Sequence, residues 1–173
     1  MPRVTIVIET QRLTLSELTP SDAAFIVELL NDPAFLANIG DRGVRDHDDA
    51  LRYIANGPAA SYAKHGFGLW LVSDKASGER LGLSGLLRRD TLPDADIGYA
   101  FLPRHRGRGY AAEACEAVIA HARHPLQLAR VLAIVSPGNE ASTRVLEKIG
   151  LRYQRRVRLG EDSEELLLYS TEA

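Results

Sequence analysis

The stretch ADIGYAFLPRHRGRGYAAEACEAVIAHAR, residues 95–123, decides the fold and the chemistry of this chain. Its first part predicts a strand over 95–102, and its Ala-rich last part predicts a helix over 111–123, closed by Pro125. A basic, glycine-rich loop joins the two. Glycine allows positive φ angles and a close approach of the backbone to a ligand. The sequence therefore predicts a strand, a ligand-binding loop and a helix in direct succession.

The loop carries the groups that a phosphate ligand requires. The first turn of a helix has N–H donors without intrahelical partners and the positive end of the helix dipole. Arg104, Arg106 and Arg108 stand beside Gly107 and Gly109. We therefore expect this loop and the following helix start to bind a phosphate or diphosphate, the alternative being a solvated basic turn.

Two common phosphate motifs do not fit the chain. The spacing Gly107-x-Gly109-x-x-Ala112 matches a dinucleotide fingerprint, but that fold needs an acidic residue about 20 positions further on. Neither Asp nor Glu occurs between Glu116 and Glu140, and no Gly-Lys pair exists for a Walker loop. The ligand is therefore expected to be a different phosphate compound.

Composition limits the class of protein. The chain has 173 residues, 21 Lys plus Arg against 23 Asp plus Glu, and 45% hydrophobic residues, which is typical of one soluble domain over residues 1–173. No apolar stretch approaches the roughly 18 residues of a membrane span, and the charge balance lacks the basic field of a nucleic-acid binder. Cys115 is the single cysteine, and its helical spacing favours a buried thiol over a nucleophile. We expect a cytoplasmic protein with no metal, nucleic-acid or membrane partner.

The remaining chain predicts a mixed sheet with helices on it, an α/β (α+β) fold of about six to seven strands. Residues 34–50 are polar and predict irregular structure. The predicted strands are 13–18, 67–73, 80–89, 95–102, 130–135, 151–159 and 164–169, and the predicted helices are 20–30, 48–55, 111–123 and 139–149.

Two motifs together resemble one enzyme family. The loop satisfies an Arg-x-x-Gly-x-Gly/Ala pattern in two registers, starting at Arg104 and at Arg106. The segment NEASTRVLEKIGL, residues 139–151, is similar to Asn-x-x-Ser-x-x-Val-x-Glu-Lys-x-Gly-Phe, with Leu151 in place of Phe. The strand start at Asp96 and the opening residues 9–15 are similar as well. These patterns resemble the GNAT family of N-acetyltransferases, and within it the RimJ/RimL-like branch that acetylates the N-termini of ribosomal proteins.

The resemblance implies a site for acetyl-CoA. In such a fold the strands at 95–102 and 130–135 lie parallel and splay apart, and the pantetheine arm enters the gap, pairing with backbone groups near Phe101 and Leu102. Direct attack of an amine on the thioester is implied, without a metal or a covalent enzyme intermediate. The cofactor-binding residues implied are Phe101, Leu102, Arg104, Arg106, Gly107, Arg108, Gly109, Tyr110, Ala111, Asn139 and Ser142.

Two side chains are candidates for proton transfer. Asp96 is a candidate general base at a position where many relatives carry Glu, and its alternative role is to accept hydrogen bonds within the sheet. Ser142 is the candidate donor to the departing thiolate, and its alternative role is hydrogen bonding at a helix start. Many relatives use a Tyr seven positions after the Asn, but this chain has Leu146 there.

The acceptor is less closely defined by the sequence. A protein N-terminal amine is the acceptor implied by the branch, while a small-molecule amine and a non-catalytic acyl-CoA sensor remain alternatives. The acidic stretch Asp41–Asp49 would suit a cationic acceptor or form a solvated loop. The sequence leaves open whether the protein forms a homodimer.

Overall fold

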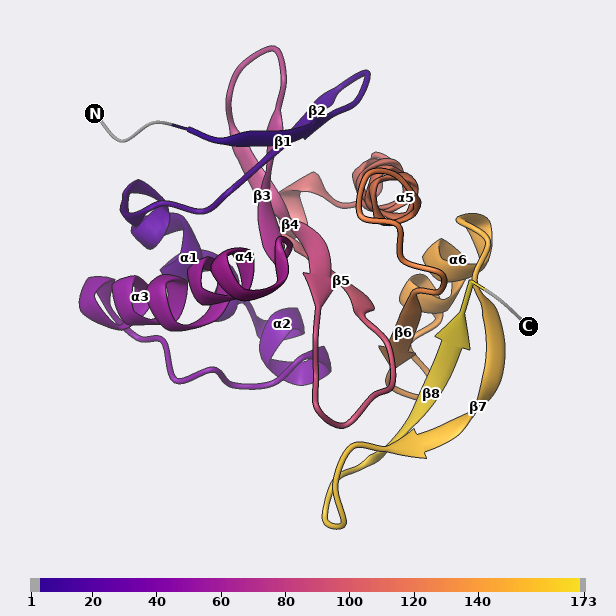
Figure 1. The fold of residues 1–173 in the computed structure, drawn as a ribbon. Helices are drawn as coiled ribbons and strands as arrows, with labels where there is room; N and C mark the ends of the chain where they lie inside the picture. Colours follow the sequence, from indigo (N-terminus) through magenta and orange to yellow (C-terminus); the bar gives the residue numbers. More distant parts are fainter. Residues whose placement is uncertain (1–3, 172–173) are drawn as a thin grey trace.

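The computed structural model describes residues 4–171. Within them one sheet contains eight strands in the order β1-β2-β3-β4-β5-β6-β8-β7 (Figure 1). All neighbours are antiparallel except β5 and β6. The strands are β1 (Ile6–Glu9), β2 (Leu13–Ser16), β3 (Leu69–Asp74), β4 (Arg80–Leu87), β5 (Asp96–Phe101), β6 (Leu132–Val135), β7 (Arg152–Arg158) and β8 (Glu165–Ser170).

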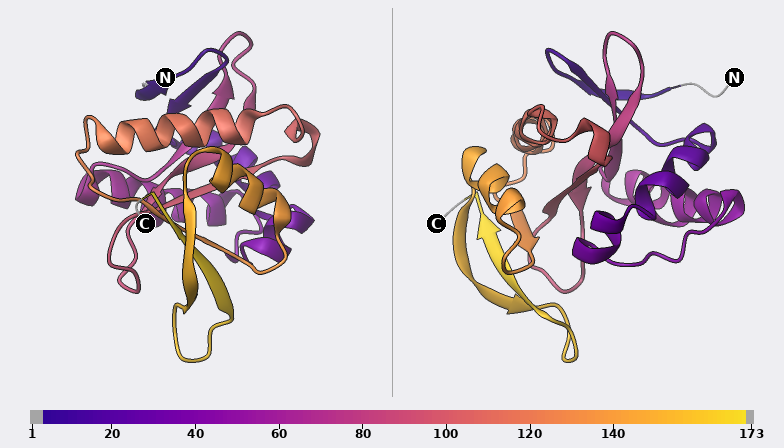
Figure 2. Two further views of the ribbon diagram at one scale, coloured as in Figure 1. Left: turned by 90° about the vertical axis from the view of Figure 1, so that its right-hand side faces the viewer. Right: turned by 180° about the vertical axis from the view of Figure 1, so that it is seen from behind.

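Helices cover both faces of the β1–β5 part of this sheet. The first four lie on one side and α5 lies on the other, as two opposite views show (Figures 1 and 2). None of the described helices is long and apolar enough to cross a membrane. The helices are α1 (Ala23–Leu30), α2 (Pro33–Asn38), α3 (His47–Ile54), α4 (Ala60–His65), α5 (Tyr110–Arg123) and α6 (Glu140–Lys148), with short helical turns at Pro20–Asp22, Ala55–Ala59 and Pro103–His105.

The predicted fold class is confirmed, including the mixed sheet and the parallel pair. One difference is β1, which was not predicted from the sequence and which brings the strand number to eight. This strand lies at the edge of the sheet, and Ile6 remains 53% exposed. An edge strand with an exposed apolar side chain lacks the buried alternation on which a strand prediction relies.

The segment expected to be irregular contains a helix. The Asp32 carboxylate accepts hydrogen bonds from the N–H groups of Ala34 at 3.1 Å and Phe35 at 3.3 Å, and Pro33 occupies the first helical position of α2. The same Asp-Pro pair that ends α1 therefore starts α2. The helix predicted over 48–55 also continues through a π turn into α4, which ends at Gly66 with φ of 78°.

Alternation along β5 divides its side chains between two cores. Ile97 and Phe101 pack with α5 residues such as Cys115 in one core. Ala100, with the opposite parity, packs against the core that α1, α2 and α3 form with the sheet, which includes Leu29. Strand β5 is thus the layer that separates α5 from the N-terminal helices.

A tight backbone contact between β3 and β4 generates a stability prediction. A Cβ atom on Gly85 would lie 2.0 Å from the Gly68 carbonyl oxygen and 2.8 Å from the Leu69 Cα. We expect Gly85→Ala to lower the free energy of unfolding by about 1–3 kcal/mol, because both obstacles are backbone atoms. Urea unfolding measures this change. The matched control is Gly57→Ala, where the nearest atom is 3.8 Å away in a helical segment; equal midpoints for the two variants would contradict the prediction.

Candidate active site

The candidate site begins where the sheet opens between β5 and β6. In the described part of the chain these strands pair at one position, Asp96 with Leu132, and the Leu132 N–H donates to the Ala95 carbonyl at 2.9 Å. Strand β6 then runs alongside β8 for four pairs. The predicted splayed parallel pair is therefore present, closed at the start of β5 and open towards its end.

The open edge of β5 presents backbone hydrogen-bonding groups. The Leu102 N–H donates to the Leu81 carbonyl at 3.1 Å, so the even-numbered residues of β5 bond to β4. The backbone groups of Tyr99 and Phe101 consequently face β6, where no strand pairs with them in the described chain. An extended ligand can add there as a strand would.

Two predicted arm-binding residues have partners already. The Leu102 N–H is used within the sheet and its side chain is buried, so a contact with the arm through that N–H is not available. The Phe101 carbonyl accepts a hydrogen bond from the Arg106 guanidinium at 2.9 Å. The free groups at the gap are thus the Phe101 N–H and the backbone of Tyr99, a residue that was not among those predicted from the sequence.

The glycine loop has the backbone geometry expected of an anion site. Gly107 and Gly109 have φ angles of 77° and 79°. Helix α5 starts at Gly109 without a side-chain cap from the described residues, and its first backbone bond is donated by the Glu113 N–H to the Gly109 carbonyl at 3.1 Å. The N–H groups of Tyr110 and Ala111 therefore lack intrahelical acceptors and stand at the positive end of a 14-residue helix.

The three loop arginines differ in whether their side chains form ion pairs with the rest of the protein. Arg104 pairs with Glu28 at 3.0 Å, and Arg106 pairs with the buried Asp32 at 3.1 Å. Both pairs tie the loop to the N-terminal helices. Arg108 is exposed, and its side chain has no partner between residues 4 and 171, which leaves it as the loop cation available to a ligand.

A residue outside the loop holds it in place. The Arg12 Nε pairs with Glu113 Oε1 at 2.6 Å, its Nη1 donates to the Arg108 carbonyl at 2.9 Å, and its guanidinium lies 4.6 Å from the centre of the Tyr110 ring. Burial would raise the pKa of Glu113, but hydrogen bonds from Thr10 and Arg12 outweigh it and lower that pKa. The role of Arg12 was not predicted, although this residue lies within the opening segment 9–15 that carries the family resemblance.

Asp96 lies at the closed end of the gap. Its side chain is 1% exposed and its Oδ1 is 3.0 Å from the Arg89 Nε. Burial raises the pKa of Asp96, while the charge and hydrogen bond of Arg89 act in the opposite direction. By alternation Asp96 shares the face of Ala100, towards the N-terminal helices. The ion pair provides a structural reason for the carboxylate, and its raised pKa makes it a better proton acceptor than an exposed Asp.

The opposite face of β5 carries a cluster of weak acids. Asn139 caps α6 by accepting the Ser142 N–H at 3.3 Å, and Ser142 is half-buried. Cys115 is fully buried, as predicted, with its Sγ 3.5 Å from the Ser84 hydroxyl. The Tyr99 hydroxyl is buried near Ser142 and Cys115, both of which influence its pKa. The structure therefore brings Ser142 together with Tyr99, not with Asp96.

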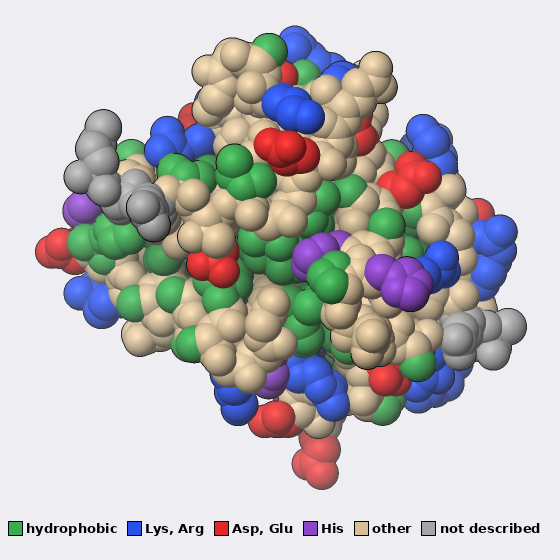
Figure 3. Space-filling view, turned by 45° about the horizontal axis from the view of Figure 1, so that its top comes forward, with side chains coloured by type: hydrophobic (Ala, Val, Ile, Leu, Met, Phe, Trp, Pro, Cys, Tyr) green, Lys and Arg blue, Asp and Glu red, His purple; other side chains and the backbone are tan. Residues whose placement is uncertain are grey.

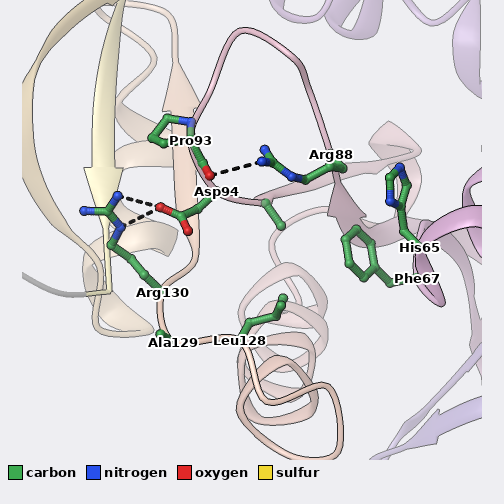
Figure 4. A pocket seen from close by; sticks show the side chains of 9 residues that line it. His65, Phe67, Arg88, Pro93, Asp94, Leu128, Ala129 and Arg130 are labelled. Atoms are coloured by element: carbon green, nitrogen blue, oxygen red, sulfur yellow. Dashed lines mark hydrogen bonds and ion pairs between the residues drawn. The ribbon is translucent and has the colours of Figure 1, made fainter.

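Two other features do not belong to this arrangement. A pocket of about 240 Å³ at the closed end of the parallel pair is bordered by charges that are already satisfied: Arg130 pairs with Asp94, and Arg88 donates to the Pro93 carbonyl (Figure 4). In the acidic stretch, Asp41 pairs with Arg45, so the stretch is partly self-neutralised. On the face shown in Figure 3, basic and acidic side chains are interspersed.

Comparisons with known proteins identify the family. A model described as "Acetyltransferase (GNAT) domain" matches residues 12–152. The chain is 34% identical over 152 residues to YkkB of Bacillus subtilis, covering 86% of this chain and 87% of that protein. An acetyltransferase structure from Agrobacterium tumefaciens has a TM-score of 0.81 at 26% identity, covering 100% of this chain and 96% of that one. The RimL ribosomal L7/L12 α-N-protein acetyltransferase in complex with coenzyme A shares the fold, with a TM-score of 0.72 at 15% identity over 95% and 96% of the two chains.

The framework of an acyl-CoA-dependent transferase is thus a sheet that opens between β5 and β6, next to helix α5, which starts at Gly109 without a side-chain cap. The chain belongs to the GNAT family and is an N-acetyltransferase that uses acetyl-CoA.

The contacts of Arg12 generate a binding prediction. We expect Arg12→Met to weaken acetyl-CoA binding about tenfold, because hydrogen bonds made by charged groups contribute about 1.5–3 kcal/mol and the loop loses several. Titration calorimetry measures the Kd. The control is Arg155→Met on β7, an exposed arginine without a partner in the described chain. An unchanged Kd in Arg12→Met would show that the loop keeps its conformation without this contact.

Proposed function

We propose that this acetyltransferase acts on the α-amine of a protein or peptide N-terminus. The proposal rests chiefly on one observation: Asp96 is the carboxylate of β5 at the point from which the sheet opens, and it is buried and paired with Arg89. A single weak base beside the reacting atoms suits an acceptor that loses its proton easily. The fold shared with RimL, whose name states an α-N-protein acetyltransferase, supports the same acceptor class.

Residues of the opened sheet would divide the binding of acetyl-CoA among them. The free N–H groups at the start of α5 and the Arg108 side chain suit the diphosphate. The Phe101 N–H and the Tyr99 backbone suit the amides of the pantetheine arm. A backbone N–H at this edge is also placed to stabilise the oxyanion that forms when the amine attacks.

Acid–base chemistry favours an α-amine over a lysine side chain. Attack on a thioester needs the neutral amine, and an α-amine titrates near 7.7–8.0 whereas a Lys side chain titrates near 10.4. Asp96 would accept the proton released as the amide forms, directly or through water. The acidic stretch at residues 41–49 offers little negative electrostatic potential to a polycationic acceptor, because Asp41 is paired with Arg45 and Asp49 with Arg52.

The first test compares acceptors. At pH 7 we expect a peptide with a free α-amine to be acetylated about 300-fold faster, in kcat/KM, than the same peptide with a blocked N-terminus and one lysine, because the neutral fractions differ by that factor. The difference should narrow as the pH rises. Thiol release measures both rates. Turnover restricted to polyamines or other small amines would overturn the acceptor assignment, and acetyl-CoA binding without turnover on any amine would favour a sensor.

The second test replaces the proposed base. We expect Asp96→Asn to lower kcat by about 100-fold at pH 7. Because the folded-state pKa of Asp96 is raised, the ionised form costs stability above that pKa and the cost disappears as the carboxyl is protonated at lower pH. Asp96→Asn should therefore unfold at an equal or higher temperature than the wild type at pH 7. A strongly lowered melting temperature, with kcat unchanged, would assign Asp96 to the Arg89 ion pair alone.

A further inference from the structure

The phenol of Tyr99 lies in the candidate site without a hydrogen-bond partner of normal geometry among the described residues. The Tyr99 hydroxyl is inaccessible to solvent, and no described residue offers it a hydrogen bond of normal geometry. Buried polar groups are paired in the great majority of cases, because an unpaired one costs about 1–3 kcal/mol. The Ser142 hydroxyl is near enough to lower the pKa of Tyr99 but makes no hydrogen bond of normal geometry with it, and such an exception beside a binding gap suggests that the missing partner belongs to a ligand.

The position of Tyr99 in the fold specifies which part of the ligand that is. Tyr99 lies on β5 at the open edge of the sheet, and its ring packs with the core that contains α5. Its hydroxyl is close enough to Ser142 of α6 and Cys115 of α5 for both to influence its pKa. Tyr99 therefore extends into the space where β5, α5 and α6 meet, three elements that carry proposed contacts to acetyl-CoA.

The alternation of side chains along β5 places the Tyr99 phenol and the candidate base Asp96 on opposite faces of the strand. Side chains at positions 97, 99 and 101 face α5, whereas position 96 has the parity of Ala100 and faces the N-terminal helices. An amine that is deprotonated at Asp96 would approach the thioester carbon from one face of the strand. The sulfur stays bonded to that carbon until the tetrahedral intermediate collapses, and it would then be open to protonation from the face of Tyr99.

We propose that Tyr99 is the proton donor to the sulfur of coenzyme A, with Ser142 beside it, an inference that rests on the proposed function. Helix α6 offers no phenol for this proton transfer, because Leu146 occupies the position that carries Tyr in many relatives, and it is 2% exposed within the core. Tyr99 would supply from the strand what those relatives supply from the helix.

The proposed step conserves atoms and charge. The amine nitrogen forms a bond to the acetyl carbon, the carbon–sulfur bond breaks, and the electron pair of that bond stays on sulfur. The Tyr99 O–H proton passes to the sulfur to give the free thiol. The phenolate recovers a proton through Ser142 or water, which balances the proton released by the amine on the Asp96 side.

The acidities of the Tyr99 phenol and of the coenzyme A thiol suit proton transfer from the first to the second. Burial raises the pKa of Tyr99 to about 12, against a smaller opposing effect of Ser142, and it raises the pKa of the neighbouring Cys115 thiol to about 12 as well. A coenzyme A thiol bound beside Tyr99 would be desolvated as Cys115 is, which would raise the pKa of that thiol and favour transfer of the Tyr99 proton to the thiolate.

The variant Tyr99→Phe removes the hydroxyl and keeps the ring. We expect kcat to fall about 100-fold while the Kd for acetyl-CoA changes less than about threefold. The melting temperature should stay equal or rise, since an unpaired buried hydroxyl is lost. Tyr53→Phe on α3, which packs with the other core, is the matched control and should leave all three quantities unchanged. A lower melting temperature with an unchanged kcat would make the hydroxyl structural and overturn the proposal.

A second readout does not depend on turnover. The thiol of bound coenzyme A is titrated through the ultraviolet absorbance of its thiolate, with the desulfo analogue as the blank. A hydrogen bond from Tyr99 stabilises the thiolate, so Tyr99→Phe should raise the pKa of the bound thiol by about one to two units. An identical titration in both proteins would overturn the proposal while leaving the acetyltransferase activity of the wild type intact. Turnover on small amines but not on peptide N-termini would instead overturn the proposed function and leave this titration unaffected.

Should Tyr99→Phe fail to fold, difluorotyrosine at position 99 provides the same test. Fluorination lowers the phenol pKa and leaves the hydroxyl in place. Since the protonated phenol is the donor, the alkaline limit of kcat should move to lower pH. A pH profile identical to that of the wild type would contradict the role of Tyr99.

Discussion

The pairing of β5 with β6 at a single position is the constraint on which the site depends. Backbone N–H and C=O groups in the middle of a sheet are expected to be paired, and leaving them unpaired away from water is costly. The chain holds β6 in place from its other side through β8, so the opening at Phe101 persists without a neighbouring strand. The sheet is thus incomplete at the one place where an extended ligand can complete it.

The proposed anion-binding end of the site is built by long-range contacts. The glycine loop has the right φ angles by itself, but its place relative to the sheet is fixed by side chains from distant parts of the sequence: Arg12 from the β1–β2 turn, Glu28 from α1 and Asp32 from the start of α2. Two of the three loop arginines are used to anchor the loop. The charge left for a ligand is then carried by Arg108 and the helix dipole.

The sequence was most informative where a local rule decides the structure. The glycines at 107 and 109 and the buried Cys115 follow from chain geometry or helical spacing, and each is present. The helix at Pro33 was missed because an Asp-Pro pair ends one helix and starts another equally well. Arg12 and Tyr99 were missed for a different reason: their roles arise from tertiary contacts with α5 and α6, which no pattern within one segment encodes. The roles of Asp96 and Ser142 stay predictions.

The alternation of side chains along β5 divides the surroundings of the strand into two sides. Strand β5, which packs against a core on each face, separates the N-terminal helices from α5 and α6. In the proposed mechanism the two proton-transfer groups, Asp96 and Tyr99, lie on opposite faces of this strand, so the two substrates would enter by separate routes. The acetylated product and the spent carrier would then leave without passing each other, and the exit of one would place no steric condition on the exit of the other.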